Sequence, residues 1–339
     1  METQPKINKF MEKDFSYWTA YNKAKTQEKY LFYLLLDELC SVIQEPIHES
    51  GRRPIPLRDL LFCACLKIYS NYSARKISSD MKHAQEAKFI SKVPHFNSLL
   101  TFMNNKFTED LLMRLITISA MPLKQLETDF AHDSTGFGCY QYARWMKVRF
   151  SQIVEKPEQL FRHYVKLHAS IGTRTNVITA AEITQGNIGD APKFSDCATV
   201  TANNFNVERY SADKAYLSRK NMQIAQALDF LPFIPFKENS RKQKPSDGLW
   251  NYMYNYCKTK PKEFNEFYHR RSNVETTFSM IKQRLGEFLK CKNLQGQKNE
   301  VLLKCLCHNI CCLIQEIHES KIEIDFNLCA ETYVAHKQI

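Results

Sequence analysis

The chain contains little glycine and proline and no long hydrophobic run. Only 9 Gly and 12 Pro occur among 339 residues, and 44% of the residues are hydrophobic. This composition predicts a folded, largely regular protein and argues against a disordered one. The longest apolar runs, 60–66 and 305–314, are too short to span a bilayer, so we expect no membrane association. The length is sufficient for two domains, or for one large core with an appendage.

A disulfide framework and a secretory signal are also lacking. Twelve cysteines follow no framework spacing, and the polar N-terminus has no apolar segment, so we expect free thiols in a reducing cytoplasm. One cysteine-rich run has the look of a metal site: Cys305-x-Cys307-His308-x2-Cys311-Cys312. On a helix, however, Cys305 and Cys307 point about 200° apart. Buried packing cysteines are therefore favoured over a zinc site.

The net charge of +11 is concentrated in two blocks. Residues 51–125 contain 12 Lys/Arg against 5 Asp/Glu, and residues 201–290 contain 16 against 9. The other parts of the chain are neutral or slightly acidic. Basic blocks favour a polyanionic partner such as nucleic acid, because phosphate neutralisation dominates the affinity of such complexes. A general solubility charge is the alternative interpretation.

Residues 10–125 have the pattern of an all-α region. Amphipathic helices are expected at 25–43, 57–69, 73–81 and 109–118. The segment 56–81 contains a helix, a short Ser/Asn turn and a second basic helix with Arg75 and Lys76, as in a helix-turn-helix. The local charge favours DNA binding over a plain helical bundle.

A mixed α/β pattern begins at about residue 126. The expected elements are strands at 128–133, 163–171 and 176–184, a helix beginning near 190, a strand at 207–212, a helix at 218–228, a strand at 231–236, helices at 261–289 and 298–318, and an irregular tail. Asp190 is interpreted as the cap of its helix, because Pro192 follows in the first turn. Residues 240–260 are basic and aromatic without a clear period.

Three carboxylates from distant segments are candidates for one site. Asp133 and Asp213 each end an expected strand, and Glu275 lies on an expected helix. Oxygen ligands suit Mg²⁺, and clustered carboxylates need a cation to offset their repulsion. Two such ions would activate a nucleophile and stabilise the leaving oxygen of an in-line phosphoryl displacement. Taken singly, each acid could equally be a turn residue, a cap or a solvated charge.

The helix expected to carry Glu275 has an unusual charge pattern. At about 100° per residue, Tyr268, Arg271, Glu275 and Lys282 fall within about 60° on one face. They lie beside an apolar stripe formed by Val274, Phe278, Ile281 and Leu285. We therefore expect these four polar side chains along the edge of a buried face, where a cleft would lie. A phosphodiester substrate would account for the nearby Arg271, Lys282 and Lys214.

Three motifs resemble those of a known family. They are His132-Asp133-Ser-Thr-Gly-Phe, Ser211-Ala-Asp213-Lys-Ala-Tyr and Tyr268-x2-Arg271-x3-Glu275-x6-Lys282. They look like the acidic motifs of DDE transposases of bacterial insertion sequences, and the last matches the Tyr-Arg-Glu-Lys signature at full spacing. The resemblance covers about 126–290 and extends to the N-terminal helices. It implies an α/β fold with a ribonuclease-H-like mixed sheet flanked by helices, and an all-α N-terminal DNA-binding region.

The resemblance also implies roles for individual residues. Asp133, Asp213 and Glu275 would be the catalytic residues and the ligands of two Mg²⁺ (or Mn²⁺) ions. Residues expected to contact double-stranded DNA are Tyr268, Arg271, Lys282, Lys214, Arg75 and Lys76. The implied activity is that of a transposase which binds terminal inverted repeats, hydrolyses phosphodiesters at the element ends and transfers the 3′-hydroxyls to target DNA. A homodimer on DNA, in the cytoplasm with the nucleoid, is expected.

Two other functions stay open on the sequence alone. One is a ribonuclease-H-like nuclease without strand transfer, and the other is a non-catalytic DNA-binding protein derived from a transposase. The second is less favoured, because a pure DNA binder has no need of three acids.

The expected domains are a DNA-binding region at 1–125, a catalytic domain at 126–318 with a small insertion near 240–260, and a tail at 319–339. Some relatives insert a large β-domain between the second and third acids, but the 61 residues present here leave no room for one. The alternating aromatics of the insertion are Trp250, Tyr252, Tyr254 and Tyr256, which fit base stacking and internal packing equally well. His132 is interpreted as a structural residue.

Overall fold

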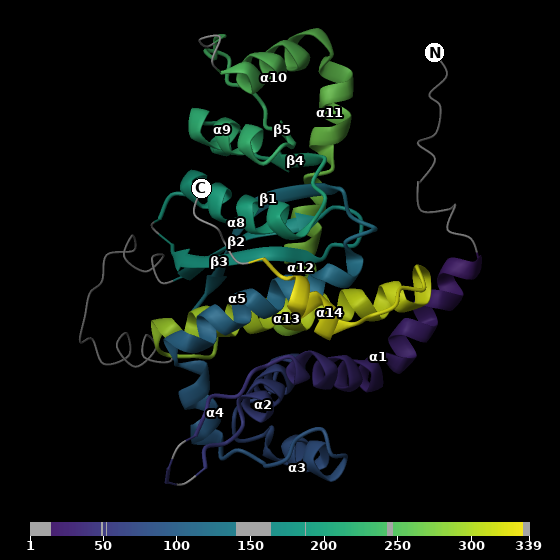
Figure 1. The fold of residues 1–339 in the computed structure, drawn as a ribbon, viewed down its shortest axis with the longest axis vertical. Helices are drawn as coiled ribbons and strands as arrows, with labels where there is room; N and C mark the ends of the chain where they lie inside the picture. Colours follow the sequence, from purple (N-terminus) through teal and green to yellow (C-terminus); the bar gives the residue numbers. More distant parts are fainter. Residues whose placement is uncertain are drawn as a thin grey trace, which may run out of the picture.

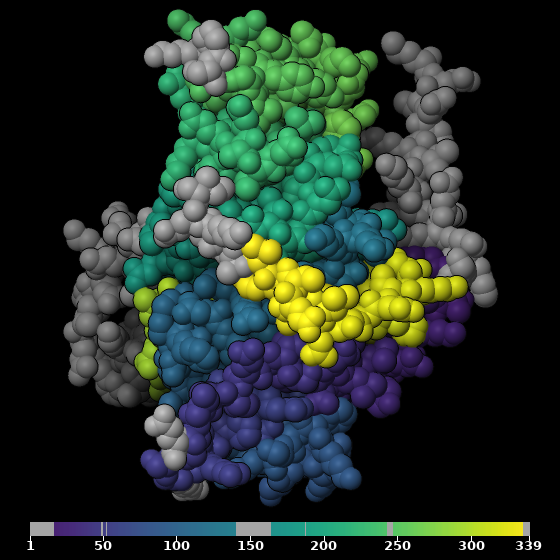
Figure 2. All heavy atoms as spheres, viewed as in Figure 1, coloured from purple at the N-terminus to yellow at the C-terminus, as the bar shows by residue number. Residues whose placement is uncertain are grey.

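Helices at both ends of the chain pack together beneath a single sheet. The structure is a computed structural model and describes residues 15–48, 50–51, 53–139, 164–186, 188–242 and 247–334. In Figure 1 the sheet and its covering helices lie above a middle layer of α5, α13 and α14, and the first four helices lie below that layer. The space-filling view shows the yellow C-terminal helices between the purple N-terminal region and the teal and green sheet region (Figure 2).

The N-terminal region is all-α, as predicted. Its helices are α1 (Phe15–Ser41), α2 (Leu57–Tyr69), α3 (Ser78–Glu86), α4 (Phe96–Met103) and α5 (Lys106–Ala120). The second helix of the expected pair begins at Ser78, so Arg75 and Lys76 lie in the preceding turn and not on that helix. Helix α4 was not expected, because its eight residues form too short a periodic pattern. A 3-10 turn, Met121–Leu123, leads to the sheet.

The sheet has five strands in the order β3-β2-β1-β4-β5. The strands are β1 (Asp129–Gly138), β2 (Tyr164–Gly172), β3 (Ile178–Gln185), β4 (Arg209–Ala212) and β5 (Leu231–Phe233). The first three pair antiparallel, whereas β4 and β5 are parallel to β1. This mixed sheet with helices on both faces is a ribonuclease-H-like fold, which confirms the predicted fold class.

The central strand β1 is longer than predicted. Residues 134–136 were expected to form a turn after Asp133, but they continue the strand because β2 pairs with β1 as far as Gly138. The side chains of β1 alternate between two environments. Phe130 and His132 contact aromatic residues of α8 and β4, while Asp129 and Asp133 are turned toward the junction of α11 and α12. Asp133 therefore lies within the strand and not at its end.

One face of the sheet is covered by α8 (Ala191–Asn204), and α9 (Arg219–Ala227) packs beside it. Asp190 occupies the N-cap position of α8, but its side chain forms no capping hydrogen bond. Lys166 Nζ donates to Asp190 Oδ1 at 2.8 Å instead. The predicted helix start is confirmed, with Asp190 at the N-cap and Pro192 in the first turn, but the Asp190 carboxylate binds Lys166 on β2 and not the first N–H groups of the helix.

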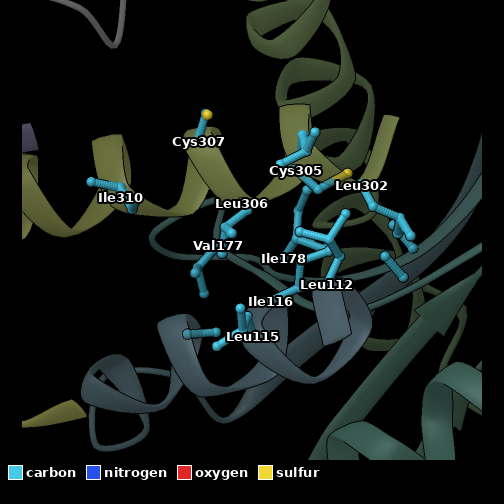
Figure 3. Packing of buried hydrophobic residues seen from close by; sticks show 14 of the residues in the cluster. Leu112, Leu115, Ile116, Val177, Ile178, Leu302, Cys305, Leu306, Cys307 and Ile310 are labelled. Atoms are coloured by element: carbon cyan, nitrogen blue, oxygen red, sulfur yellow. The ribbon is translucent and has the colours of Figure 1, made fainter. Parts of the chain in front are cut away.

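Helix α13 (Leu294–Glu319) is the central core helix. It contacts α1, α2 and α5 as well as β3, so it joins the N-terminal helices to the sheet. Figure 3 shows its side chains meeting Leu115 and Ile116 of α5, with Val177 and Ile178 close by. By length and composition α13 could cross a membrane, but 83% of its most apolar window is buried inside the protein. Cys305 and Cys307 are fully buried in this core and pack as small apolar residues.

The segment expected to form one helix over 261–289 is two helices. They are α11 (Pro261–His269) and α12 (Ser272–Leu285), with a tight turn at Arg270 and Arg271 between them. In that turn the Arg271 N–H donates to Tyr268 O at 3.0 Å. Helix α12 ends at Gly286, whose φ of 88° is unfavourable for other residues. The tail also contains a helix, α14 (Phe326–Thr332), which packs on α5.

The insertion contains a helix, α10 (Gly248–Thr259), which was not predicted because no helical period is clear in this segment. Its aromatic side chains follow helical spacing and fall on two faces. Trp250 and Tyr254 both contact Phe236 and face inward, whereas Tyr252 and Tyr256 stack on each other at 6.2 Å. The first pair is a packing stripe. The second pair lines a small pocket, where base stacking stays a prediction.

Candidate active site

Asp133 is the innermost of the three predicted acids. Its Oδ1 accepts the Ser134 N–H at 2.8 Å, and its Oδ2 accepts Arg271 Nη1 at 2.6 Å. Burial raises the pKa of the Asp133 carboxyl above its usual value, although both hydrogen-bond partners oppose that rise. The negative charges of Asp213 and Glu275 raise the pKa further. The two other acids are therefore close enough to act electrostatically on Asp133.

Asp213 reaches the same place because β4 runs parallel to β1. The register pairs His132 with Ala212, so the residues after them, Asp133 and Asp213, lie at the same level of neighbouring strands. Asp213 Oδ1 accepts the Lys214 N–H at 2.7 Å and caps the 3-10 turn Lys214–Tyr216. This cap fixes the direction of the carboxylate.

Glu275 lies in the first turn of α12 and is the most exposed of the three. Its side chain is 65% exposed, against 21% for Asp133. Glu275 Oε1 accepts Arg271 Nη2 at 3.0 Å. Topology thus brings the three predicted acids to one region: Asp133 from within β1, Asp213 from just after β4 and Glu275 from α12.

Arg271 lies among these acids and bridges two of them. Its guanidinium is 19% exposed and donates to both Asp133 and Glu275. Burial lowers the Arg271 pKa, but the charges of Asp133, Tyr268, Glu275 and Asp213 outweigh it and raise the pKa overall. The guanidinium also lies 5.9 Å from the centre of the Tyr268 ring. The structure therefore places Arg271 as the counter-cation of the acid cluster.

The remaining signature residues, Lys282 and Tyr268, lie near the acids. Lys282 Nζ donates to Thr135 Oγ1 at 2.9 Å and lies 5.4 Å from the centre of the Phe137 ring. Lys214 is exposed directly after Asp213. The sequence predicted all four signature residues on one helix, but Tyr268 belongs to α11, whereas Glu275 and Lys282 belong to α12. Arg270 and Arg271 between the two helices keep helical dihedral angles, and the Arg271 guanidinium lies over the Tyr268 ring, so Tyr268 stays beside the site.

Arg75 and Lys76 lie elsewhere. Both are exposed in the turn between α2 and α3, and the Arg75 guanidinium lies 4.7 Å over the Phe96 ring. In Figure 1 α2 and α3 belong to the lowest layer, and the turn between them meets the end of α12, where Lys290 Nζ donates to Asn71 Oδ1 at 2.7 Å. Glu275 lies in the first turn of α12, at the opposite end of that helix. The structure thus separates the predicted DNA contacts into two groups.

A salt-bridge cluster next to the site was missed from the sequence. Arg209 and Arg270 both donate to Asp129, which lies four residues before Asp133 on the same side of β1. The Phe267 ring lies beneath both guanidiniums, at 4.7 Å and 5.4 Å from its centre. This clamp fixes the turn that carries Arg271. The adjacent arginines 270 and 271 could have indicated this cluster, since two neighbouring guanidiniums each need an acidic partner.

The donor set matches a hard divalent cation, because it consists of carboxylate oxygens around a site with excess negative charge. As the side chains stand, no three His, Cys, Asp or Glu side chains in the described parts of the chain are grouped closely enough to hold a metal ion. The Arg271 guanidinium takes part of that space. Asp133, Asp213 and Glu275 would hold the ion once this guanidinium moved.

Comparison with known families decides the assignment. The family described as the transposase DDE domain matches residues 124–310, more than half of the chain. The chain belongs to this family of transposases. No individual curated protein and no solved structure matches it. The matched segment includes all three acids and the whole sheet. As a DDE transposase the protein acts on DNA in transposition, and members of the family generally use divalent metal ions.

Proposed function

We propose that this transposase binds the terminal inverted repeats of its element, hydrolyses the phosphodiester at each end and transfers the freed 3′-hydroxyl to target DNA. The observation that carries the proposal is the convergence of Asp133, Asp213 and Glu275 at one place within the matched family segment. A cluster of three acids sharing one arginine has an excess of negative charge, which a structural role does not require.

The three acids are the proposed ligands of two Mg²⁺ or Mn²⁺ ions. When bound, such ions activate the attacking hydroxyl and stabilise the leaving oxygen of an in-line displacement. Asp133 is already fixed by the Ser134 N–H, and Asp213 by the Lys214 N–H. The Glu275 side chain can change position most easily, because it is exposed and, among the described residues, binds only Arg271. The chain thus supplies two rigid ligands and one adjustable ligand.

Basic side chains around the acids are proposed to hold the DNA backbone. Lys214 is exposed beside Asp213. Lys282 extends from α12 to Thr135, two residues beyond Asp133 on β1. Arg271 lies between α11 and α12, with its guanidinium over the ring of Tyr268 at the end of α11. Guanidinium and ammonium groups bind phosphate oxygens with charge-assisted hydrogen bonds.

The N-terminal region, residues 1–125, is proposed to recognise the element ends, with Arg75 and Lys76 as phosphate contacts. Residues 126–318 form the proposed catalytic domain, with the insertion near 240–260 and the tail from 319. The core helix α13 packs on both parts, which supports a fixed relation between them. Two ends must be cut and joined together, so a homodimer on DNA is proposed, in the cytoplasm with the nucleoid.

An assay with the purified protein, Mg²⁺ and duplexes carrying the repeats that flank its gene tests this function. Joined products are expected from the wild type and none from Glu275→Gln. Cleavage without joining would indicate a nuclease, and a shifted but uncut duplex would indicate a DNA-binding protein without catalysis. Normal joining by Glu275→Gln would show that the assigned site is wrong.

A further inference from the structure

The Arg271 side chain occupies the position that a metal ion would need. One guanidinium spans Asp133 and Glu275, at 2.6 Å and 3.0 Å, and is also attracted by Asp213. The other oxygen of Asp133 is engaged by the Ser134 N–H at 2.8 Å. A divalent cation at these oxygens would strongly repel a guanidinium held only a few ångströms away. Metal and Arg271 therefore compete for Asp133.

A DNA phosphate is a suitable new partner for the displaced guanidinium. Arg271 lies between two helices, beside the Tyr268 ring, so its side chain can turn away from the acids without a change of the backbone. A phosphate offers the same bidentate oxygen geometry as the carboxylates that Arg271 would leave. Arg270 and Lys282 bind Asp129 and Thr135, so among these side chains Arg271 alone bridges Asp133 and Glu275.

We propose that Arg271 is the internal counter-cation of the acid cluster in the DNA-free protein, and that its transfer to a DNA phosphate opens Asp133 and Glu275 to the metal. This inference rests on the proposed function, because it takes the three acids as metal ligands. It adds that metal and DNA bind cooperatively through one side chain. By linkage, each ligand raises the affinity for the other by the same factor. The acids thereby bind metal only weakly in the absence of DNA.

The test measures Mn²⁺ binding to the full-length protein without DNA, by the electron paramagnetic resonance signal of free Mn²⁺. Arg271→Gln is expected to bind Mn²⁺ about tenfold more tightly than the wild type, a coupling of ordinary size. Lys258→Gln is the control: it removes one positive charge from an exposed side chain of α10 and leaves the Asp129 clamp and the three acids intact. Its Mn²⁺ affinity is expected to stay within about twofold of the wild-type value, since an exposed charge away from the acids is screened by salt.

The reciprocal effect is read from DNA affinity, measured by fluorescence anisotropy on an end-carrying duplex in Ca²⁺ and in EDTA. Ca²⁺ is expected to strengthen binding by the wild type and by Lys258→Gln, and to do so much less for Arg271→Gln. If Arg271→Gln does not fold, Arg271→Lys replaces it, because a lysine cannot bridge two carboxylates in the same way.

The outcomes separate this inference from the proposed function. Unchanged or weaker Mn²⁺ binding by the Arg271 variant, while Asp133→Asn abolishes binding, overturns the inference alone. Mn²⁺ binding that persists at full strength in Asp133→Asn overturns the assignment of the metal site and the inference with it.

Discussion

Two aspartates on the same side of β1 have opposite surroundings. Asp129 is held by Arg209 and Arg270, and Arg209 is also paired with Glu208, so the charges are balanced. Asp133, four residues further along, shares the single Arg271 with Glu275 and is repelled by Asp213. The first cluster is a finished structural clamp. In the second, three acids share one arginine, and this difference supports the proposed cation site more than the presence of acids alone does.

The largest difference between the two clusters should appear in catalysis. Asp133→Asn, Asp213→Asn and Glu275→Gln should each lower the rate of end cleavage by at least about 10³-fold, equivalent to about 4 kcal/mol in the barrier. Asp129→Asn should retain most of the cleavage activity at a temperature where it is folded. Rates of cleavage of an end-carrying duplex in Mg²⁺ measure both. Equal losses of cleavage rate in Asp129→Asn and Asp133→Asn would show that the two aspartates do not differ in their role in catalysis.

Stability should show the reverse order. Asp129→Asn should lower the free energy of unfolding by about 1–3 kcal/mol, because it leaves two partly exposed arginines without their shared acceptor. Asp133→Asn should cost little or raise stability. The raised pKa of Asp133 means that the folded state favours the protonated form, so stability is lost as pH rises and this carboxyl ionises.

Urea unfolding of the two variants at pH 7 checks this reversal. A loss at Asp133 as large as the loss at Asp129 would mean that the acid cluster is structural.

A buried lysine near the far end of β1, Lys304, extends the comparison. Lys304 is 1% exposed, lies 5.5 Å from the centre of the Phe137 ring and donates to Gly286 O. Burial lowers its pKa from 10.5 to about 8, against the attraction of Glu300. A depressed lysine pKa means that stability is gained as pH rises from about 8 toward 10.5, and lost as pH falls through 8.

The wild type should therefore gain about 1–2 kcal/mol of unfolding free energy relative to Lys304→Met between pH 8 and pH 9.5. Parallel unfolding titrations of the two proteins measure the difference. A constant difference over that range would show that Lys304 titrates at its ordinary pKa.

The smallest effect is expected far from both aspartates. Replacing Arg75 and Lys76 together by alanine should weaken DNA binding several-fold for any sequence and reduce the slope of log affinity against log salt by about 2. Anisotropy titrations at several salt concentrations give the slope. An unchanged slope would remove this turn from the DNA contacts and leave the lysines near the acids as the main ones.

Much of this arrangement could be predicted from the sequence. The motifs around Asp133, Asp213 and Glu275 indicated the fold class, and alternation and turn residues located the hairpin β2–β3. The interruption at Arg270 could not be predicted, because the periodicity continues through it and the two arginines bind acids on a distant strand, Asp129 and Asp133. The N-cap position of Asp190 was predicted, but its ion pair with Lys166 was not, since Lys166 lies on another element.

Asp133, Asp213 and Glu275 are proposed to form a metal site that Arg271 leaves when DNA binds. The decisive experiment is anomalous diffraction from crystals of the protein with an end-carrying duplex and Mn²⁺. We expect Mn²⁺ peaks in contact with carboxylate oxygens of these three residues, and the Arg271 guanidinium bound to a DNA phosphate. Arg271 still bridging Asp133 and Glu275, with Mn²⁺ bound elsewhere, would contradict it.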